Sequence, residues 1–338
     1  MSNSPSNKPI DRRRVLSFMA AAPIMLGVVP QGRANTEQAT ASSATPMHAE
    51  TEIFRHMVGE IEVIAIADGY TALPSQIMLG LDPDEAQEAA RLAYKNYDPN
   101  LISIAVNSYV IRTAGTIIAI DAGAPSFLSP TVGAWRNGLD LAGIAPEQID
   151  MMFLTHMHTD HVAGLVDENG KKTLPQVELV LSETEWTDSF DDEKMAYLPK
   201  EFAPFVQYSR GQVLPYKDQR NLVSMKKETE IAPGVFAVPL PGHTMGHMGV
   251  RIQSQNQSLM IWGDIIHSPT YQFSHPEWST IIDADPALSA AARTKLLDQS
   301  AADRTMVAGM HLDFPSLGYV ERQNNSYRYI SAPRNYGG

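Results

Sequence analysis

The 338-residue chain contains no cysteine. Without cysteine there is no disulfide bond, no thiolate nucleophile and no thiolate metal ligand, so the chemistry of the protein must use oxygen and nitrogen groups. Positive charge is also scarce: 26 Lys and Arg stand against 38 Asp and Glu, and the formal net charge is −12. Because nucleic-acid binding depends on Lys and Arg contacts with phosphates, we expect no nucleic-acid partner.

The N-terminal segment carries Arg12–Arg14 ahead of an apolar run that is too short to span a bilayer as a mature helix. This pattern resembles a twin-arginine export signal, with a small-x-small cleavage site at its end. We therefore expect a signal peptide at 1–34, a flexible polar linker at 35–51 and one catalytic domain at 52–338. The mature protein would be periplasmic or secreted, with no stable membrane anchor. The alternative is an uncleaved anchor or an ordinary basic N-terminus.

Apolar periodicity and turn residues predict alternating strands and helices after the linker. The predicted strands are 61–69, a hairpin over 102–123, 149–156, 176–182, 234–243, 248–254, 258–264 and 305–311. The predicted helices are 82–96, 129–144, 183–208 and 285–303. No fixed-period repeat or linker interrupts this region, which favours one domain whose two β-rich halves pack sheet on sheet with helices outside.

Three histidines and one aspartate, all of metal-ligand type, crowd the stretch "FLTHMHTDHVAG", although the chain has only ten histidines. His156 and His158 lie two positions apart in an extended segment, so they face the same side and can reach one ion. Asp160 and His161 would point towards a second position a few ångströms away. Imidazole and carboxylate ligands suit Zn²⁺, Mn²⁺, Fe²⁺ or Co²⁺.

Three further candidates, His243, Asp264 and His311, each lie at or just beyond the end of a predicted strand. A single histidine is more often a hydrogen-bonded core residue than a ligand, but the combination with the first cluster indicates a metal site. The remaining histidines have no partner motif and are expected on the surface or in the linker. They are His48, His56, His267 and His275.

The ordered set "THMHTDH", "GHTMGH", "GD" and "GMH" resembles the HxHxDH, H, D, H pattern of the metallo-β-lactamase superfamily. Within it, "IEVIAIADGYTALP", "IDAGA" and "SYRYISAPRNYG" are most similar to the methyl parathion hydrolase and lactonase-like branch. The resemblance implies an α/β fold, a four-layer αβ/βα sandwich in which two mixed sheets pack face to face with helices outside. It also makes a homodimer possible.

Residue by residue, the resemblance implies two divalent ions, with zinc expected first and Mn, Fe or Co as alternatives. The first ion would be held by His156, His158 and His243, the second by Asp160, His161 and His311, and Asp264 would bridge both. Asp121 is expected to orient a metal histidine through its far ring nitrogen; the alternative is a turn-forming aspartate before Gly123. His247 is expected to form structural hydrogen bonds without binding metal.

Such a site favours hydrolysis, because two ions that share a hydroxide activate it for attack on a carbonyl carbon or phosphorus. Asp160 and Asp264 are the catalytic candidates for moving the proton. The expected substrate is a small neutral ester, either a lactone of the acyl homoserine type or a triester of the methyl parathion type. Aromatics that could line its pocket, each also a candidate for the core, are Trp186, Phe190, Phe205, Phe273 and Trp278.

The loop "GAPSFLSPT" departs from the pattern, because an aromatic expected near Leu128 stands at Phe127 instead. This departure favours a lactone or another small ester over an aryl phosphotriester. β-Lactam or thioester hydrolysis within the same superfamily is an alternative. A non-catalytic extracytoplasmic metal-binding protein is a further alternative, which the complete ligand set disfavours.

Overall fold

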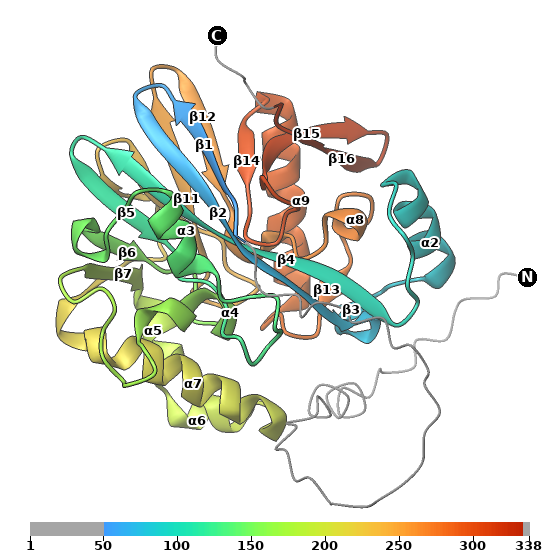
Figure 1. Ribbon diagram of the computed structural model, residues 1–338. Helices are drawn as coiled ribbons and strands as arrows, with labels where there is room; N and C mark the ends of the chain where they lie inside the picture. The colour runs from blue at the N-terminus through green and yellow to red at the C-terminus, as the bar shows by residue number, and fades with distance from the viewer. Residues whose placement is uncertain (1–50, 334–338) are drawn as a thin grey trace, which may run out of the picture.

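Two mixed seven-stranded sheets form the centre of the computed structural model, which describes residues 51–333 (Figure 1). The predicted signal peptide and all but the last residue of the predicted linker lie outside the described residues and stay predictions, as does His48. Within 51–333, no helix is long and apolar enough to cross a membrane. A short pair, β3 (Met78–Leu79) with β13 (Ser279–Thr280), forms the third sheet of this region.

The first sheet is antiparallel from β1 to β5 and parallel from β5 to β8. Its spatial order is β1 (Ile53–Val58), β2 (Ile61–Pro74), β4 (Leu101–Thr113), β5 (Thr116–Ile120), β6 (Met151–Phe153), β7 (Glu178–Ser182) and β8 (Arg220–Val223).

The second sheet is antiparallel except where β12 and β14 run parallel. Its spatial order is β16 (Ser326–Ser331), β15 (Leu317–Gln323), β14 (Met306–Ala308), β12 (Gln257–Ile261), β11 (Met248–Ser254), β10 (Val235–Pro239) and β9 (Thr229–Ala232).

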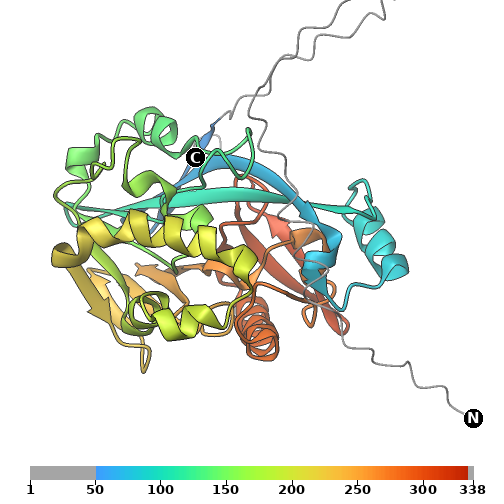
Figure 2. The same ribbon diagram turned by 90° about the horizontal axis from the view of Figure 1, so that it is seen from below.

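The helices lie outside the two sheets, most of them on the outer faces, as the two views in Figures 1 and 2 show. They are α2 (Pro83–Leu92), α3 (Trp135–Leu141), α4 (Thr159–Val162), α5 (Glu183–Ser189), α6 (Asp192–Ala196), α7 (Ala203–Val213), α8 (Pro269–Gln272) and α9 (Pro286–Asp303). Short 3-10 turns join them, among them η4 (Lys200–Phe202) and η6 (Gly263–Ile265).

Alternation along β2 divides the core into layers. Val63 and Ala65 belong to the cluster between the two sheets, together with β10 to β12 and β14. Ile64 and Ile66 point the other way and pack against Trp135 of α3. A third cluster lies between the second sheet and α9. Because side chains in a strand alternate between faces, one strand serves two layers, and the expected four-layer αβ/βα sandwich is confirmed.

Several predicted elements are shorter than expected. The predicted helix over 129–144 is limited to α3, and the one over 183–208 is three separate helices, interrupted around Phe190 and at Pro199. The strands predicted over 149–156 and 305–311 end at Phe153 and Ala308. The candidate ligands therefore lie on loops a few residues past the strands, where side chains from both sheets can meet.

Candidate metal centre

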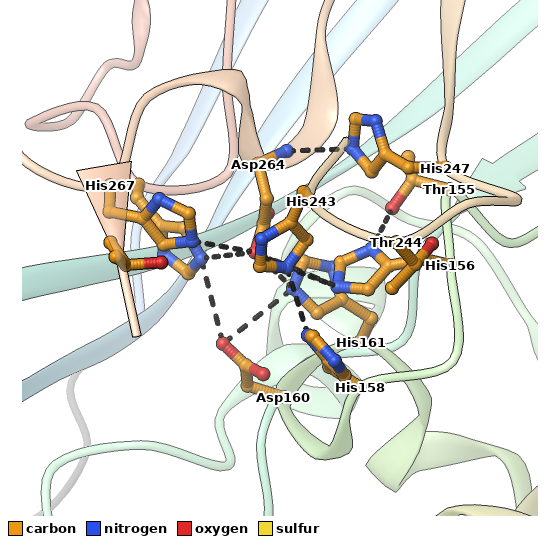
Figure 3. Close-up of polar contacts among 12 residues, drawn as sticks. Thr155, His156, His158, Asp160, His161, His243, Thr244, His247, Asp264 and His267 are labelled. Carbon is orange, nitrogen blue, oxygen red and sulfur yellow. Dashed lines mark hydrogen bonds and ion pairs between the residues drawn. The ribbon is translucent and has the colours of Figure 1, made fainter. Parts of the chain in front are cut away.

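The seven predicted ligands come together at the edge of the sandwich, on loops that follow β6, β10, β12 and β14 (Figure 3). Four of these seven side chains come from the single loop and helix after β6. The other three come from the second sheet. Their positioning therefore depends on how the two halves of the sandwich pack.

The first ligand set consists of His156, His158, His243 and Asp264, whose ligand atoms all lie within 4.8 Å of one another. His243 Nε2 is 2.9 Å from His158 Nδ1 and 3.2 Å from His156 Nε2. Imidazole nitrogens that face each other this closely need a proton or a cation between them. Donors bound to one tetrahedral zinc at about 2.0–2.1 Å lie about 3.4 Å apart, so the arrangement fits a shared ion.

The second ligand set consists of Asp160, His161 and His311. Asp264 Oδ2 lies between the two sets, 3.1 Å from His311 Nε2 and 3.3 Å from the Nε2 atoms of both His161 and His243. The structure thus brings together every residue of the predicted ligand set, in the two groups that the sequence suggested. Their metal ligation itself stays a prediction.

Asp121 fixes two of the histidines from outside the ligand set. Its Oδ2 accepts a hydrogen bond from His161 Nδ1 at 2.7 Å and another from Thr155 Oγ1 at 2.8 Å. The Thr155 hydroxyl also lies 3.0 Å from His156 Nδ1. With the far nitrogen of each ring occupied in this way, Nε2 of His161 and of His156 faces the site and is the atom through which each ring can bind a metal.

Two more histidines are held through Nδ1 in the same manner. His243 Nδ1 lies 2.8 Å from Asp283 Oδ1, and the other oxygen of Asp283 accepts from the Thr280 backbone N–H. His311 Nδ1 donates to the Ala105 carbonyl at 2.7 Å. Sequence reasoning missed Asp283, because its only link to the motif is a contact with a histidine forty positions earlier.

The electrostatics of the site favour a bound cation. Buried atoms without a hydrogen-bond partner include His161 Nε2, which faces the site, and Asp264 Oδ1. Burial lowers the pKa of His161, but the carboxylates around it outweigh this effect and raise that pKa well above its ordinary value. Burial and the charge at His243 lower the pKa of His158 to about 3, which leaves its ring neutral as a ligand. The side chains present therefore fit divalent ions.

His247 has both ring nitrogens engaged with the backbone. Nδ1 donates to the Leu240 carbonyl at 2.9 Å, and Nε2 accepts from the Asp264 N–H at 3.0 Å. Gly263 adopts a φ of 59° next to this ring, and a Cβ there would collide with it. His247 thus supports the turn that presents Asp264 and has no nitrogen left for a metal.

The expectation that His267 is a surface residue is wrong. His267 is 3 % exposed, and its ring stacks on that of His311 at 5.4 Å. Its Nε2 lies 3.5 Å from Asp264 Oδ2, and neither ring nitrogen has a hydrogen-bond partner. The short spacing Asp264-x-x-His267 was the available signal, because the tight turn at η6 directs both side chains into the site. His56 and His275 are partly exposed.

The loop after Asp121 carries Phe127, which is 58 % exposed and packs edge-on against Tyr208 of α7 at 5.0 Å. Phe205 lies 6.4 Å from the same ring, and α7 contacts α4, the helix that carries Asp160. The buried Asp68 carboxylate holds this loop by accepting three backbone N–H groups, at residues 124, 133 and 135. An apolar wall therefore stands beside the second ligand set.

The other candidate pocket aromatics do not join that wall. Phe273 and Trp278 are buried in separate cores, 2 % and 3 % exposed. Trp186 and Phe190 pack on each other and on the core between the first sheet and its helices. Phe205 alone of the five expected aromatics contacts the loop with Phe127.

The sequence and the fold match known proteins. Residues 103–311 match the sequence model of a protein family, the metallo-beta-lactamase superfamily. The N-acyl homoserine lactonase AiiB of Agrobacterium fabrum is 26% identical over 176 residues, which are 46% of this chain and 61% of AiiB. A probable metallo-hydrolase of Mycobacterium tuberculosis is 25% identical over 42% of this chain and 44% of its own. The chain thus spans less than two thirds of each of these relatives.

Two solved structures match over most of their length. The hydrolase AbOPH, described as belonging to the beta lactamase superfamily, has a TM-score of 0.77 and 26% identity, and the match covers 84% of this chain and 98% of AbOPH. AidC, a dizinc quorum-quenching lactonase, has a TM-score of 0.75 and 24% identity over 84% of this chain and 99% of AidC. The AidC match adds support for the fold alone.

Proposed function

The chain belongs to the metallo-beta-lactamase superfamily, and we propose that it is a dinuclear-metal hydrolase of small neutral esters, with lactones as the favoured class. One observation carries the proposal. Two sets of ligand atoms meet at Asp264 Oδ2, and the Asp264 side chain is only 2 % exposed. The side chain of Asp160, in the second ligand set, is 26 % exposed. The site is buried at its centre and open at one edge.

Two divalent ions held there, zinc being the first expectation, would supply an activated water as nucleophile and polarise the bond under attack. The chain's own charges favour a neutral substrate. Four aspartates surround the site, Asp121, Asp160, Asp264 and Asp283, and they balance two divalent cations. Within residues 51–333 the ion pairs of these carboxylates are with histidines, and none is with a lysine or an arginine.

Asp160 and Asp264 differ in solvent exposure, and we assign them different roles for this reason. Asp264 is enclosed by histidines, and although burial raises its pKa, their charges outweigh this and hold the pKa well below its ordinary value. It therefore stays ionised and bridges the two sets. Asp160 has access to solvent and substrate, so we assign it the transfer of the proton from the attacking water to the leaving alcohol.

His267 is the third polar group that can contact the substrate. Burial lowers the pKa of its ring, which therefore stays neutral and carries one N–H. Its Nε2 lies 3.5 Å from Asp264 Oδ2, too far for a well-formed hydrogen bond, so the described residues satisfy the N–H poorly. A substrate carbonyl oxygen next to Asp264 would supply an acceptor, and a preorganised donor at that position stabilises the charge that develops on this oxygen.

The lactone class is favoured by two considerations. AiiB, which shares 26% identity over its matched part, is an N-acyl homoserine lactonase. The Phe127, Phe205 and Tyr208 rings offer an apolar contact for a chain attached to the lactone ring. Export through the predicted twin-arginine signal would bring the enzyme to diffusible extracellular lactones, which fractionation of cells that express the full chain can test.

The test is metal analysis coupled to a hydrolysis screen. Purified protein should contain about two divalent ions per chain and hydrolyse N-acyl homoserine lactones faster than methyl parathion-type triesters, thioesters or β-lactams. His158→Ala, which removes one ligand of the first set, is the matched control and should lose both an ion and the activity. A metal-loaded protein inert towards all four classes would refute the proposal.

A further inference from the structure

Glu185 is a buried acid that belongs to neither ligand set. It lies in the first turn of α5, is 3 % exposed, and both of its carboxylate oxygens accept hydrogen bonds. One donor is the Met157 backbone N–H, at 2.8 Å from Oε1. The other is Thr244 Oγ1, at 2.5 Å from Oε2.

These two donors stand next to three of the histidines. Met157 is the residue between His156 and His158, and Thr244 directly follows His243. One carboxylate therefore connects the tips of two ligand loops that come from different sheets. Apart from the contacts among the histidines themselves, a backbone hydrogen bond from Met248 N to the Thr155 carbonyl at 2.9 Å joins the loops at their base, next to the strands.

The N-terminus of α5 is itself anchored to the second of these loops. Ser182 Oγ donates to the Gly246 carbonyl at 2.7 Å and accepts from the Glu185 N–H at 2.9 Å. Gly246 also packs directly on the backbone of Glu185, where a Cβ would collide with it. Glu185 is thus held rigidly relative to His243, as a group must be if it is to fix the position of others.

We propose that Glu185 is a positioning residue for the first ligand set, which fixes the separation of His158 and His243 by bonding the residue beside each. The Glu185 side chain forms no hydrogen bond with Asp160, His161 or His311, or with a residue next to any of them. Its one link to the second ligand set is that Met157 belongs to the same loop as Asp160 and His161. Loss of Glu185 should therefore weaken the first metal position and spare the second. The inference rests on the proposed function only in assuming that both sets bind metal ions.

The experiment measures metal binding without substrate. Cobalt(II) is titrated into the metal-free protein against a competing chelator, and the visible absorption of the bound ions is recorded. Glu185→Met keeps the side-chain length but accepts neither hydrogen bond. The substitution should lower the affinity for one of the two ions by about 10- to 100-fold, the usual effect of removing a group that orients a ligand. The spectrum of the remaining ion should match that of His158→Ala and differ from that of Asp160→Ala.

Glu185→Gln is the conservative variant. Its oxygen can accept from Met157 and its amide can donate to the Thr244 hydroxyl, so binding of both ions should return to within about threefold of the wild type. Asp191→Ala removes the cap of the neighbouring helix α6 and controls for general loss of stability. It should leave both affinities unchanged. In the metal-free protein, the Met157 amide should exchange with solvent faster in Glu185→Met than in Glu185→Gln.

If Glu185→Met binds both ions as the wild type does, or loses the ion that Asp160→Ala loses, the inference is overturned. If Glu185→Met does not fold, Thr244→Val is measured in its place. It removes one hydroxyl at a partly buried position and should selectively lower the affinity for the ion of the first ligand set. Equal affinities in Thr244→Val and the wild type would then overturn it. Selective loss in a protein that hydrolyses none of the tested esters would refute the proposed function and support the role of Glu185.

Discussion

Replacing Asp121 by Asn should weaken metal binding at the second ligand set, because the change reverses the tautomer of His161. In the wild type, Asp121 Oδ2 accepts the proton of His161 Nδ1, and Nε2 is left as a lone pair. In the variant, the amide oxygen can stay with the Thr155 N–H, and the amide nitrogen then faces His161. The His161 ring can accept a hydrogen bond from this amide only if its Nδ1 is unprotonated. The proton of the neutral ring is then on Nε2, where it blocks coordination of the metal ion.

The expected magnitude follows from the bond that is lost. A hydrogen bond to a charged group contributes about 1.5–3 kcal/mol, which corresponds to about 10- to 150-fold in a binding constant. Asn is the appropriate substitution because Asp121 has a φ of 56°, a left-handed conformation that Asn adopts at a lower cost than most other residues. The effect can therefore be measured without added backbone strain.

Chelator competition with zinc or cobalt measures the two affinities. The control is Asp150→Asn, whose carboxylate accepts the Ile117 N–H on the exposed side of the sheet and should leave both affinities unchanged. Two ions bound to Asp121→Asn with wild-type affinity would refute the tautomer argument. So would the selective loss of the ion held by His158.

Four further predictions concern single substitutions. Asp264→Asn should reduce bound metal and lower turnover by at least about 100-fold, because it weakens the bridge between the sets; two retained ions with full activity would contradict the dinuclear assignment. His267→Ala should lower kcat by about 100-fold with both ions retained, and unchanged kinetics would exclude its contact with substrate. Arg293→Met should lower the free energy of unfolding by about 3 kcal/mol, since the buried Ile265 carbonyl loses its donor and the Pro276 and Trp278 carbonyls each lose one hydrogen bond from the guanidinium; urea denaturation that shows a loss below about 1 kcal/mol would contradict this. Burial raises the pKa of Asp68 to about 6 from 3.8. The stability that this group contributes is therefore fully present below about pH 4, and it declines by up to about 3 kcal/mol as the pH rises through 6. Unfolding of metal-free Asp68→Asn should lack this decline, and parallel pH profiles of variant and wild type would refute the shift.

Local patterns predicted two β-rich halves that pack sheet on sheet and the candidate ligand residues, whereas the four-layer fold and the division of the ligands between two ions were implied by the family resemblance. Apolar strands followed by ligand-type residues were visible at His156, His243 and His311, because strand periodicity and ligand chemistry both leave a local mark. The strands ended earlier than predicted for the same reason: in "MMFLTH" and "MVAGMH" apolar residues continue past the last ladder pair, and composition does not mark where pairing stops. The division of 183–208 into three helices was missed although Pro199 stands inside it.

Asp283 and Glu185 could not be identified from the sequence, since each acts through a contact with a residue far along the chain. An aspartate before a helix and a glutamate in a first turn are common caps, and nothing local distinguishes these two. His267 was assigned to the surface because it has no partner motif in the sequence, yet the turn at η6 buries it against His311. Long-range packing decides all three positions.

Ligand identity and ligand orientation are specified differently by the sequence. Ligand identity requires a residue type at a place along the chain, which a motif can specify. Ligand orientation requires an acceptor behind each ring, and any carbonyl or carboxylate that the fold brings there will serve: Asp121 behind His161, Asp283 behind His243 and a backbone carbonyl behind His311. Substitutions at such acceptors should therefore change metal affinity one site at a time, whereas a change at Asp264, which faces both sets, should affect the two together.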